Sequence, residues 1–215
     1  MSLWGALGAA FMKAFSGRWL ALWPFGAGAA AYGLLQTFFF KPVGLYVFGH
    51  ELSHALAAFL SGCEVKSFSA SPKGGEVILN RSNVWVALAP YFLPLYTLVV
   101  AGVFGLVNVY AGFRSPPAGW GFAVGFTLSF HVFLTVHALR QRQPDLKEAG
   151  TPLSLVLILL VFGLVLACVL KLFFPGWVSL RGLWAHWVSC LLLCLDRVGA
   201  AASFLAGLAR ERGLW

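Results

Sequence analysis

The sequence predicts an all-α polytopic membrane protein with about six transmembrane helices and one short β-hairpin-like insertion. Two observations carry this fold class. The chain is 60% hydrophobic and only 10% charged, with a mean hydropathy of +0.84, a balance foreign to soluble domains. Apolar segments of span length also follow one another along the chain. We therefore expect the 215 residues to form a single membrane-embedded domain over 1–215.

The apolar segments lie in order at 19–40, 42–61, 84–112, 119–140 and 153–174, with a weaker sixth at 177–195. The first is rich in small residues, and the fourth carries Gly121-x-x-x-Gly125. Both patterns favour close approach between helix backbones. The polar connection at 62–83 instead indicates two short strands, Glu64–Ala70 and Glu76–Asn80, around a turn. A plain loop is the alternative.

The basic residues predict how the chain lies in the membrane. There are 15 Lys and Arg against 7 Asp and Glu. Because the bases are scattered singly, we expect them to set topology, with no nucleic acid as a partner. Six spans with an inner N-terminus leave only four bases outside: Lys41, Arg114, Lys171 and Arg181. Both termini are then cytoplasmic in a cell membrane, with 198–215 as a tail on its surface.

An HExxH motif, His50-Glu51-Leu52-Ser53-His54, lies inside the second apolar segment. Histidines four residues apart fall on one helix face, so both imidazoles can reach one metal ion. The glutamate between them is placed to take a proton from water on that metal. Ionisable groups at membrane depth cost about 2.5–3.5 kcal/mol each on insertion scales, and so are functional by default. The motif predicts a zinc peptidase; histidines that only hydrogen-bond to neighbouring spans are the alternative.

A catalytic zinc ion usually has three protein ligands and one open position, so a third ligand must come from elsewhere in the chain. The remaining acids and histidines are few: Glu64, Glu76, Asp145, Glu148, Asp196, Glu211, His131, His137 and His186. Asp145 is the best placed. Pro144 breaks the helix where the fourth span ends, on the side towards which His54 points. The alternative role of Asp145 is an N-cap for the turn leading into the fifth span.

His131 and His137 lie within the fourth span, six residues apart and therefore not on one helix face. Either could support a metal ligand through a hydrogen bond or replace the third ligand. His186 is far along the chain and is assigned no role.

These residues resemble the site-2 protease family of intramembrane zinc metallopeptidases. The resemblance is carried by His50–Ala58, by the strand-like region ending in Gly74-Gly75-Glu76-Val77, and by Ala87-Leu88-Ala89-Pro90 at the start of the next span. It covers roughly 42–150, which is similar to the three-helix catalytic core of that family. The helices at 153–195 would follow this core, without an appended PDZ domain.

The resemblance implies zinc bound by His50, His54 and Asp145, with Glu51 as the general base. Two departures stand out. Family members commonly have Asp-Gly at the third ligand, whereas Leu146 follows Asp145 here. They also often carry an asparagine after Gly-Pro in the next span, whereas this chain has Ala89-Pro90 followed by Tyr91, which would take the place of that polar side chain.

The resemblance also implies an activity: hydrolysis of peptide bonds in membrane-embedded or membrane-anchored proteins by metal-activated water. We expect a polar channel from the cytoplasmic side, and pairing of an unwound substrate with the strand-like region at 64–80. The partners would be the lipid bilayer and a membrane protein or peptide substrate. A membrane metal transporter, a metal-binding scaffold using the same histidines, and a prenyl-protein peptidase are the alternatives.

Overall fold

The computed structural model describes residues 22–39, 41–113, 116–140, 144–147 and 150–174, with single positions between 179 and 196. The chain divides into two units, residues 1–177 and 178–215, and every helix and strand named below belongs to the first. The sixth span at 177–195 and the tail at 198–215 lie outside the continuously described residues, so both stay predictions.

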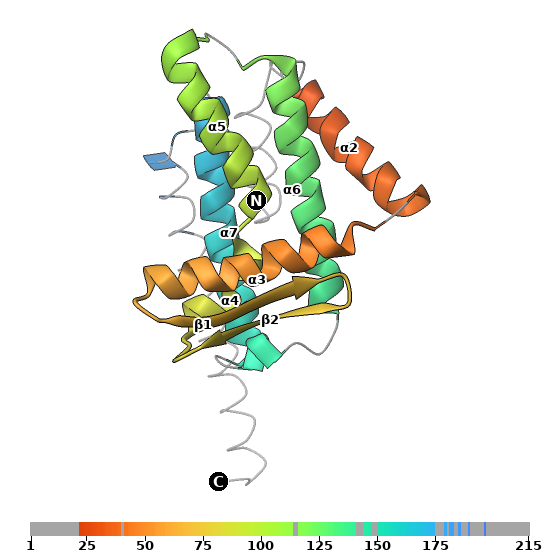
Figure 1. Ribbon diagram of the computed structural model, residues 1–215. Coiled ribbons are helices and arrows are strands. Elements are labelled where there is room, and N and C mark those ends of the chain that lie inside the picture. The colour runs from red at the N-terminus through yellow and green to blue at the C-terminus, as the bar shows by residue number, and fades with distance from the viewer. Residues whose placement is uncertain are drawn as a thin grey trace, which may run out of the picture. The chain divides into compact units, whose positions relative to one another are not determined.

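The described chain is mostly helical, with one small sheet (Figure 1). Its elements, in chain order, are α2 Trp23–Phe38, α3 Val43–Leu60, β1 Val65–Ser71, β2 Gly74–Leu79, α4 Val84–Phe92, α5 Leu95–Ala111, α6 Ala118–Leu139, the 3-10 helix η2 Pro144–Lys147, and α7 Thr151–Phe173. The HExxH motif lies in α3, and the strands follow that helix directly.

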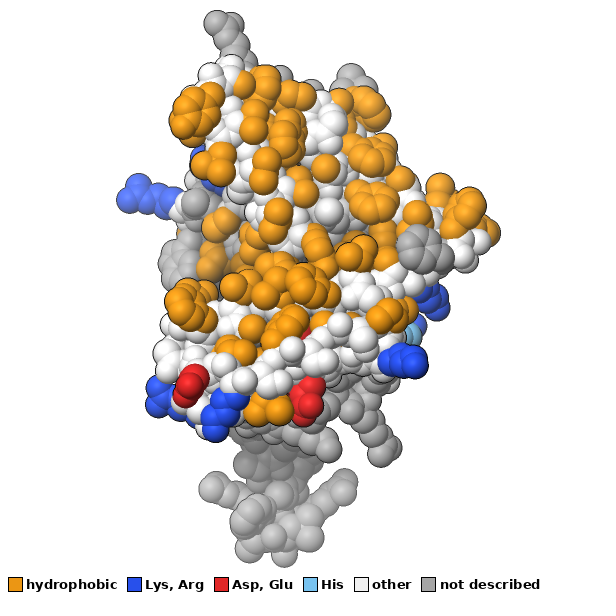
Figure 2. All heavy atoms as spheres, in the orientation of Figure 1, with side chains coloured by type: hydrophobic (Ala, Val, Ile, Leu, Met, Phe, Trp, Pro, Cys, Tyr) orange, Lys and Arg blue, Asp and Glu red, His pale blue; other side chains and the backbone are white. Residues whose placement is uncertain are grey.

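Within the described residues, three helices are long and apolar enough to cross a membrane by length and composition: Val43–Leu60, Ala118–Leu139 and Leu153–Phe173. The pair α4 and α5 would add a fourth span if it is counted as one. Apolar side chains cover the visible face of the long helices, and charged side chains gather along the lower edge, over the hairpin (Figure 2). So extensive an exposed apolar surface suits lipid and not water.

The segment at 84–112, predicted as one span, is not one continuous helix. Two helices occupy this segment, and they are bent by 73° at a short break. The bend has a local cause, because Pro90 lies inside α4 and Pro94 is the N-cap residue of α5. Each proline lacks the N–H that a continuous helix needs, so backbone carbonyls of the preceding turn are left free. Hydropathy alone does not register this break.

Glycines bring α2 and α6 into backbone contact. A Cβ on Gly28 would clash with the Phe122 backbone, and one on Gly125 would clash with the Phe25 backbone. Farther along, the Ser129 hydroxyl donates a 3.2 Å hydrogen bond to the Ala29 carbonyl. Gly121 of α6 meets Pro24 at the start of α2, and Phe133 meets Gly33 farther along, so α2 and α6 run parallel. The close packing predicted from the small residues is therefore present.

The hairpin predicted after the motif helix is confirmed, with strand bounds shifted by a few residues. β1 and β2 pair antiparallel, and the register runs from Val65 opposite Leu79 to Ser71 opposite Gly74. Gly62 ends the motif helix in the left-handed region, with φ of 68°, which turns the chain back along α3.

Candidate metal centre

His50 and His54 project from the same face of α3, and their ring centroids lie 5.0 Å apart. Neither side chain is fully exposed, since 12% and 14% of their side-chain surfaces are accessible. The spacing of four residues therefore places both imidazoles on one face of the helix, as expected. Ser53, on a different face of the same helix, is buried, and its hydroxyl donates to the Gly49 carbonyl at 2.7 Å.

Asp145 reaches these histidines from η2, the short turn that follows α6. The turn is held in place by its neighbour Leu146, which is buried in a cluster with Leu88, Tyr91, Ala138 and Ile158. The buried Ser154 hydroxyl of α7 also donates to the Leu146 carbonyl at 3.1 Å. One apolar anchor and one hydrogen bond therefore hold the backbone beside Asp145.

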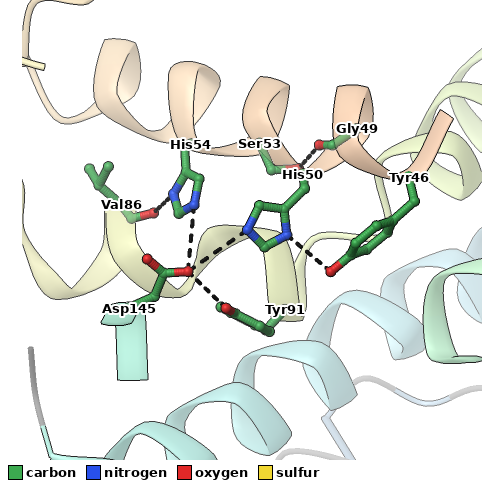
Figure 3. A network of polar contacts seen from close by, with 8 residues as sticks. All are labelled: Tyr46, Gly49, His50, Ser53, His54, Val86, Tyr91 and Asp145. Carbon is green, nitrogen blue, oxygen red and sulfur yellow. Dashed lines mark hydrogen bonds and ion pairs between the residues drawn. The ribbon is translucent and has the colours of Figure 1, made fainter. Parts of the chain in front are cut away.

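Three ligand atoms converge on one point (Figure 3). The Nε2 atoms of His50 and His54 each lie 3.8 Å from Oδ2 of Asp145. Ligand atoms about 2.0–2.2 Å from a tetrahedral zinc ion are about 3.4 Å apart, so a small inward shift would complete such a site. The three side chains predicted as ligands thus form a group that could hold a metal ion.

Pro90 explains how His54 is oriented. In a regular helix the Val86 carbonyl would accept from the N–H of residue 90, but proline has none. The free carbonyl lies 2.8 Å from Nδ1 of His54, and since a carbonyl only accepts, Nδ1 carries the proton. Nε2 is then left with its lone pair towards Asp145. This backbone tether was not predicted, although a proline four residues ahead of a carbonyl is its signal.

His50 has a comparable tether in Tyr46, whose hydroxyl lies 3.3 Å from Nδ1 of His50. Donation from Nδ1–H to this hydroxyl leaves Nε2 free to face Asp145. Hydrogen bonds of this kind fix the tautomer and ring orientation of metal-binding histidines. Sequence reasoning missed Tyr46, yet its position four residues before His50, on the same helix face, could have identified it.

Tyr91 links α4 to the third ligand. Its buried hydroxyl donates a 2.7 Å hydrogen bond to Oδ2 of Asp145, the oxygen that also faces both histidines. Its carbonyl, freed where α4 ends, lies 3.2 Å from Nε2 of His131 on α6. His131 therefore contacts the backbone of Tyr91 and is not in the group of three ligands.

Asp145 lies outside the apolar helices, and its surroundings favour the charged form. Burial of this carboxyl group works to raise its pKa, but the neighbouring side chains of His50 and Tyr91, together with His54, hold the pKa below its ordinary value. A carboxylate kept ionised is the form that binds a cation.

Glu51 faces the same cavity as the three ligands. This cavity has a volume of about 510 Å³ and is also lined by Gly75, Glu76 and Arg81. The hairpin comes so close that a Cβ on Gly75 would lie 2.5 Å from Cγ of Glu51. Glycine at position 75 is therefore required for β2 to cover this part of α3.

The other acids and histidines considered as third ligands are not part of the metal-binding group found among the described residues. Glu64, Glu76, His137 and Asp196 are exposed. Glu148, Glu211 and His186 lie outside the described residues. Asp145 is not the N-cap of the turn leading into the fifth span, because it lies inside that turn, η2, and not before it.

Comparison with known proteins gave no match: no family model, curated protein or solved structure aligns with this chain. The function therefore has to be argued from the site.

Replacing Tyr91 with Phe should weaken metal binding by about 10- to 100-fold, the usual cost of removing a group that orients a ligand. The change deletes the hydrogen bond to Asp145 and keeps the ring that packs in the core. The measurement is Zn²⁺ affinity by competition with a chromogenic chelator. Tyr110→Phe, at a tyrosine that is 91% exposed on α5, is the matched control and should bind like the parent. Equal affinity in both variants would show that the Tyr91 hydroxyl does not position Asp145.

Replacing Pro90 with Ala restores an N–H opposite the Val86 carbonyl, so the helix competes with His54 for that acceptor. Zn²⁺ affinity should fall by up to about tenfold, while the thermal stability of the protein stays the same or rises. Pro117→Ala, before α6 and away from the site, is the control. An affinity unchanged by Pro90→Ala would mean that the freed carbonyl does not hold the imidazole.

Proposed function

We propose that this protein is a zinc metallopeptidase of the site-2 protease type, acting on membrane-embedded or membrane-anchored protein substrates. The observation that carries the proposal is the convergence of His50, His54 and Asp145 on one point, with Glu51 beside them in the same cavity. Two histidines and one carboxylate, with the fourth direction open to a cavity, are the pattern of catalytic zinc sites.

The donor set supports zinc among the common divalent metals. Imidazole nitrogens suit zinc, copper, iron and nickel, whereas magnesium and calcium prefer oxygen ligands throughout. Both imidazoles are also held through Nδ1 by groups outside the centre, which leaves Nε2 as the ligand atom. Glu51, a potential base next to the ligands, favours hydrolysis over electron transfer or oxygen chemistry.

When bound, zinc would lower the pKa of water to about 7 and polarise the scissile carbonyl group. The protein's own residues would do the rest. Glu51 takes the proton from the attacking water and delivers it to the departing amine. Tyr91 and the Val86 carbonyl keep Asp145 and His54 in place during these steps. Water enters through the cavity beside the hairpin, where Glu76 and Arg81 give it a polar wall.

The proposal includes a multi-pass membrane location. α6 and α7 meet the requirements of a span, and α4 with α5 can form a bent one. A helical substrate shields its peptide bonds, so it must unwind before cleavage. β2 lines the cavity, and an unwound segment pairing with the hairpin would keep its backbone groups satisfied. The order of motif helix, hairpin and Ala-Pro helix is also what resembles the site-2 protease family.

Glu51→Gln should separate metal binding from catalysis. The variant keeps all three ligands, so it should bind one Zn²⁺ per chain, while peptide cleavage falls by about 10²- to 10⁴-fold, the usual contribution of a general base. The probe is a library of synthetic peptides, each with an apolar stretch of about 20 residues. It is incubated with the purified protein in detergent, and new N-termini are identified by mass spectrometry.

The control is Glu64→Gln, an exposed acid on the hairpin side of the protein, which should cleave like the parent. Wild-type cleavage by Glu51→Gln would contradict the peptidase assignment. A parent protein that binds Zn²⁺, cuts no peptide and moves Zn²⁺ across liposomes would instead be the metal transporter weighed from the sequence.

A further inference from the structure

The motif helix meets the apolar bundle crosswise. Figure 1 shows α3, together with the hairpin, running crosswise over the lower part of α6 and α7, beyond the lower end of α5. Its packing partners are mainly α4, β1 and β2. The side-chain contacts agree: Asp145, just beyond the end of α6, lies 3.8 Å from His50 and His54, which are in the middle of α3. The centre of α3 thus lies within side-chain reach of the turn that follows α6.

Both ends of α3 also lie at that end of the bundle. Because α2 runs parallel to α6, the C-terminal end of α2 and the following Lys41 lie in the half of the bundle in which α6 ends. At the other end of α3, the hairpin leads into α4, whose Tyr91 bonds to Asp145. The chain therefore enters and leaves α3 on one side of the bundle.

The hairpin lies lengthwise along α3. Its turn packs near the start of the helix, since a Cβ on Gly44 would lie 3.3 Å from Cγ of Pro72. Its open end lies near the end of the helix, where Arg81 donates to the Gly62 carbonyl at 3.0 Å. If α3 crossed a bilayer, this two-stranded sheet would cross beside it. Exposed strand edges and charged side chains are not tolerated in the hydrocarbon layer.

We propose that α3 does not cross the bilayer: together with the hairpin it lies along one membrane face, embedded in a single phospholipid leaflet. The inference rests on the membrane location within the proposed function, but not on peptidase activity. The face that α3 turns to lipid is an apolar stripe spaced three or four residues apart, opposite the histidines: Leu45, Phe48, Leu52, Leu56 and Phe59. Four of these five side chains are exposed, Phe59 at 77%.

The charges around this module match a membrane surface. Phe48 meets Phe68 of β1 at a ring distance of 5.9 Å, so the stripe continues onto the hairpin. Five exposed cationic residues flank this module, before α3, on the hairpin, before α4 and at the end of α6: Lys41, Lys66, Lys73, Arg81 and Arg140. Apolar side chains in the acyl layer with cations at the headgroups are the pattern of interfacial helices. By the positive-inside rule this face is cytoplasmic.

Two earlier expectations change under this proposal. Lys41 is then on the inner side of the membrane and not on the outer side. The start of α2 at Trp23 is then at the outer face, whereas the topology with α3 as a span places the N-terminus in the cytoplasm. The metal centre sits at the membrane–water boundary, so the substrate class narrows to peptide bonds near the end of a membrane segment.

Cysteine labelling tests the proposal. Lys41→Cys, Lys66→Cys and Phe113→Cys are expressed singly, and each is labelled with a membrane-impermeant maleimide in inverted and in right-side-out vesicles. Phe113 follows the end of α5, at the face away from the metal centre. Signal above the parent, which keeps its native cysteines, is scored, and retained Zn²⁺ affinity shows that each variant is folded.

We expect Lys41→Cys and Lys66→Cys to react from the same side, in inverted vesicles, and Phe113→Cys from the other. Reaction of Lys41→Cys and Lys66→Cys from opposite sides would show that α3 crosses the bilayer and would overturn the proposal. The result is independent of the cleavage assay: an inactive protein with this labelling pattern would keep the inference and lose the peptidase function.

Discussion

The hydrogen bond from the Tyr91 hydroxyl to Asp145 joins α4 to η2, and the position of the third predicted ligand depends on it. Asp145 stands on a four-residue turn with few contacts of its own, and Tyr91 stands on a nine-residue helix that the prolines keep separate from α5. The same short helix supplies the Val86 carbonyl to His54 and receives His131 at its end. α4 is therefore the element that brings the motif helix, the third ligand and α6 together.

A broken helix is costly in an apolar setting because its freed carbonyl groups must find donors. Here one donor is His54, from the group of three side chains, and the other is His131 of α6. Pro90 frees the carbonyl that orients His54, and the end of α4 frees the one that meets His131. Pro90 and the early end of α4 prevent this helix from being a simple span. The same two features supply the carbonyl groups that orient His54 and contact His131. This coupling explains why a polar centre can be assembled against an apolar bundle.

Much of the centre could be predicted because its information is local. The spacing of His50 and His54 depends only on helix geometry, and Pro144 marks the turn from which Asp145 reaches them. Tyr91 was identified only through a family resemblance, and Tyr46 was missed although it lies on the same face as His50. The bend at Pro94 and the crosswise position of α3 were not predicted. A hydropathy count measures length and apolarity, and an interfacial helix bounded by a hairpin can equal a span in both.

Together these features describe three side chains that could hold a metal ion, gathered with Glu51 and the hairpin on one side of an apolar bundle. The central claim is that His50, His54 and Asp145 bind zinc. X-ray absorption spectroscopy of the zinc-loaded protein tests this claim most directly. The account predicts a first shell of nitrogen and oxygen at about 2.0–2.2 Å with imidazole scattering from two histidines, and loss of an oxygen ligand signal in Asp145→Ala. Sulfur at about 2.3 Å, or a spectrum unchanged by the loss of Asp145, would contradict it.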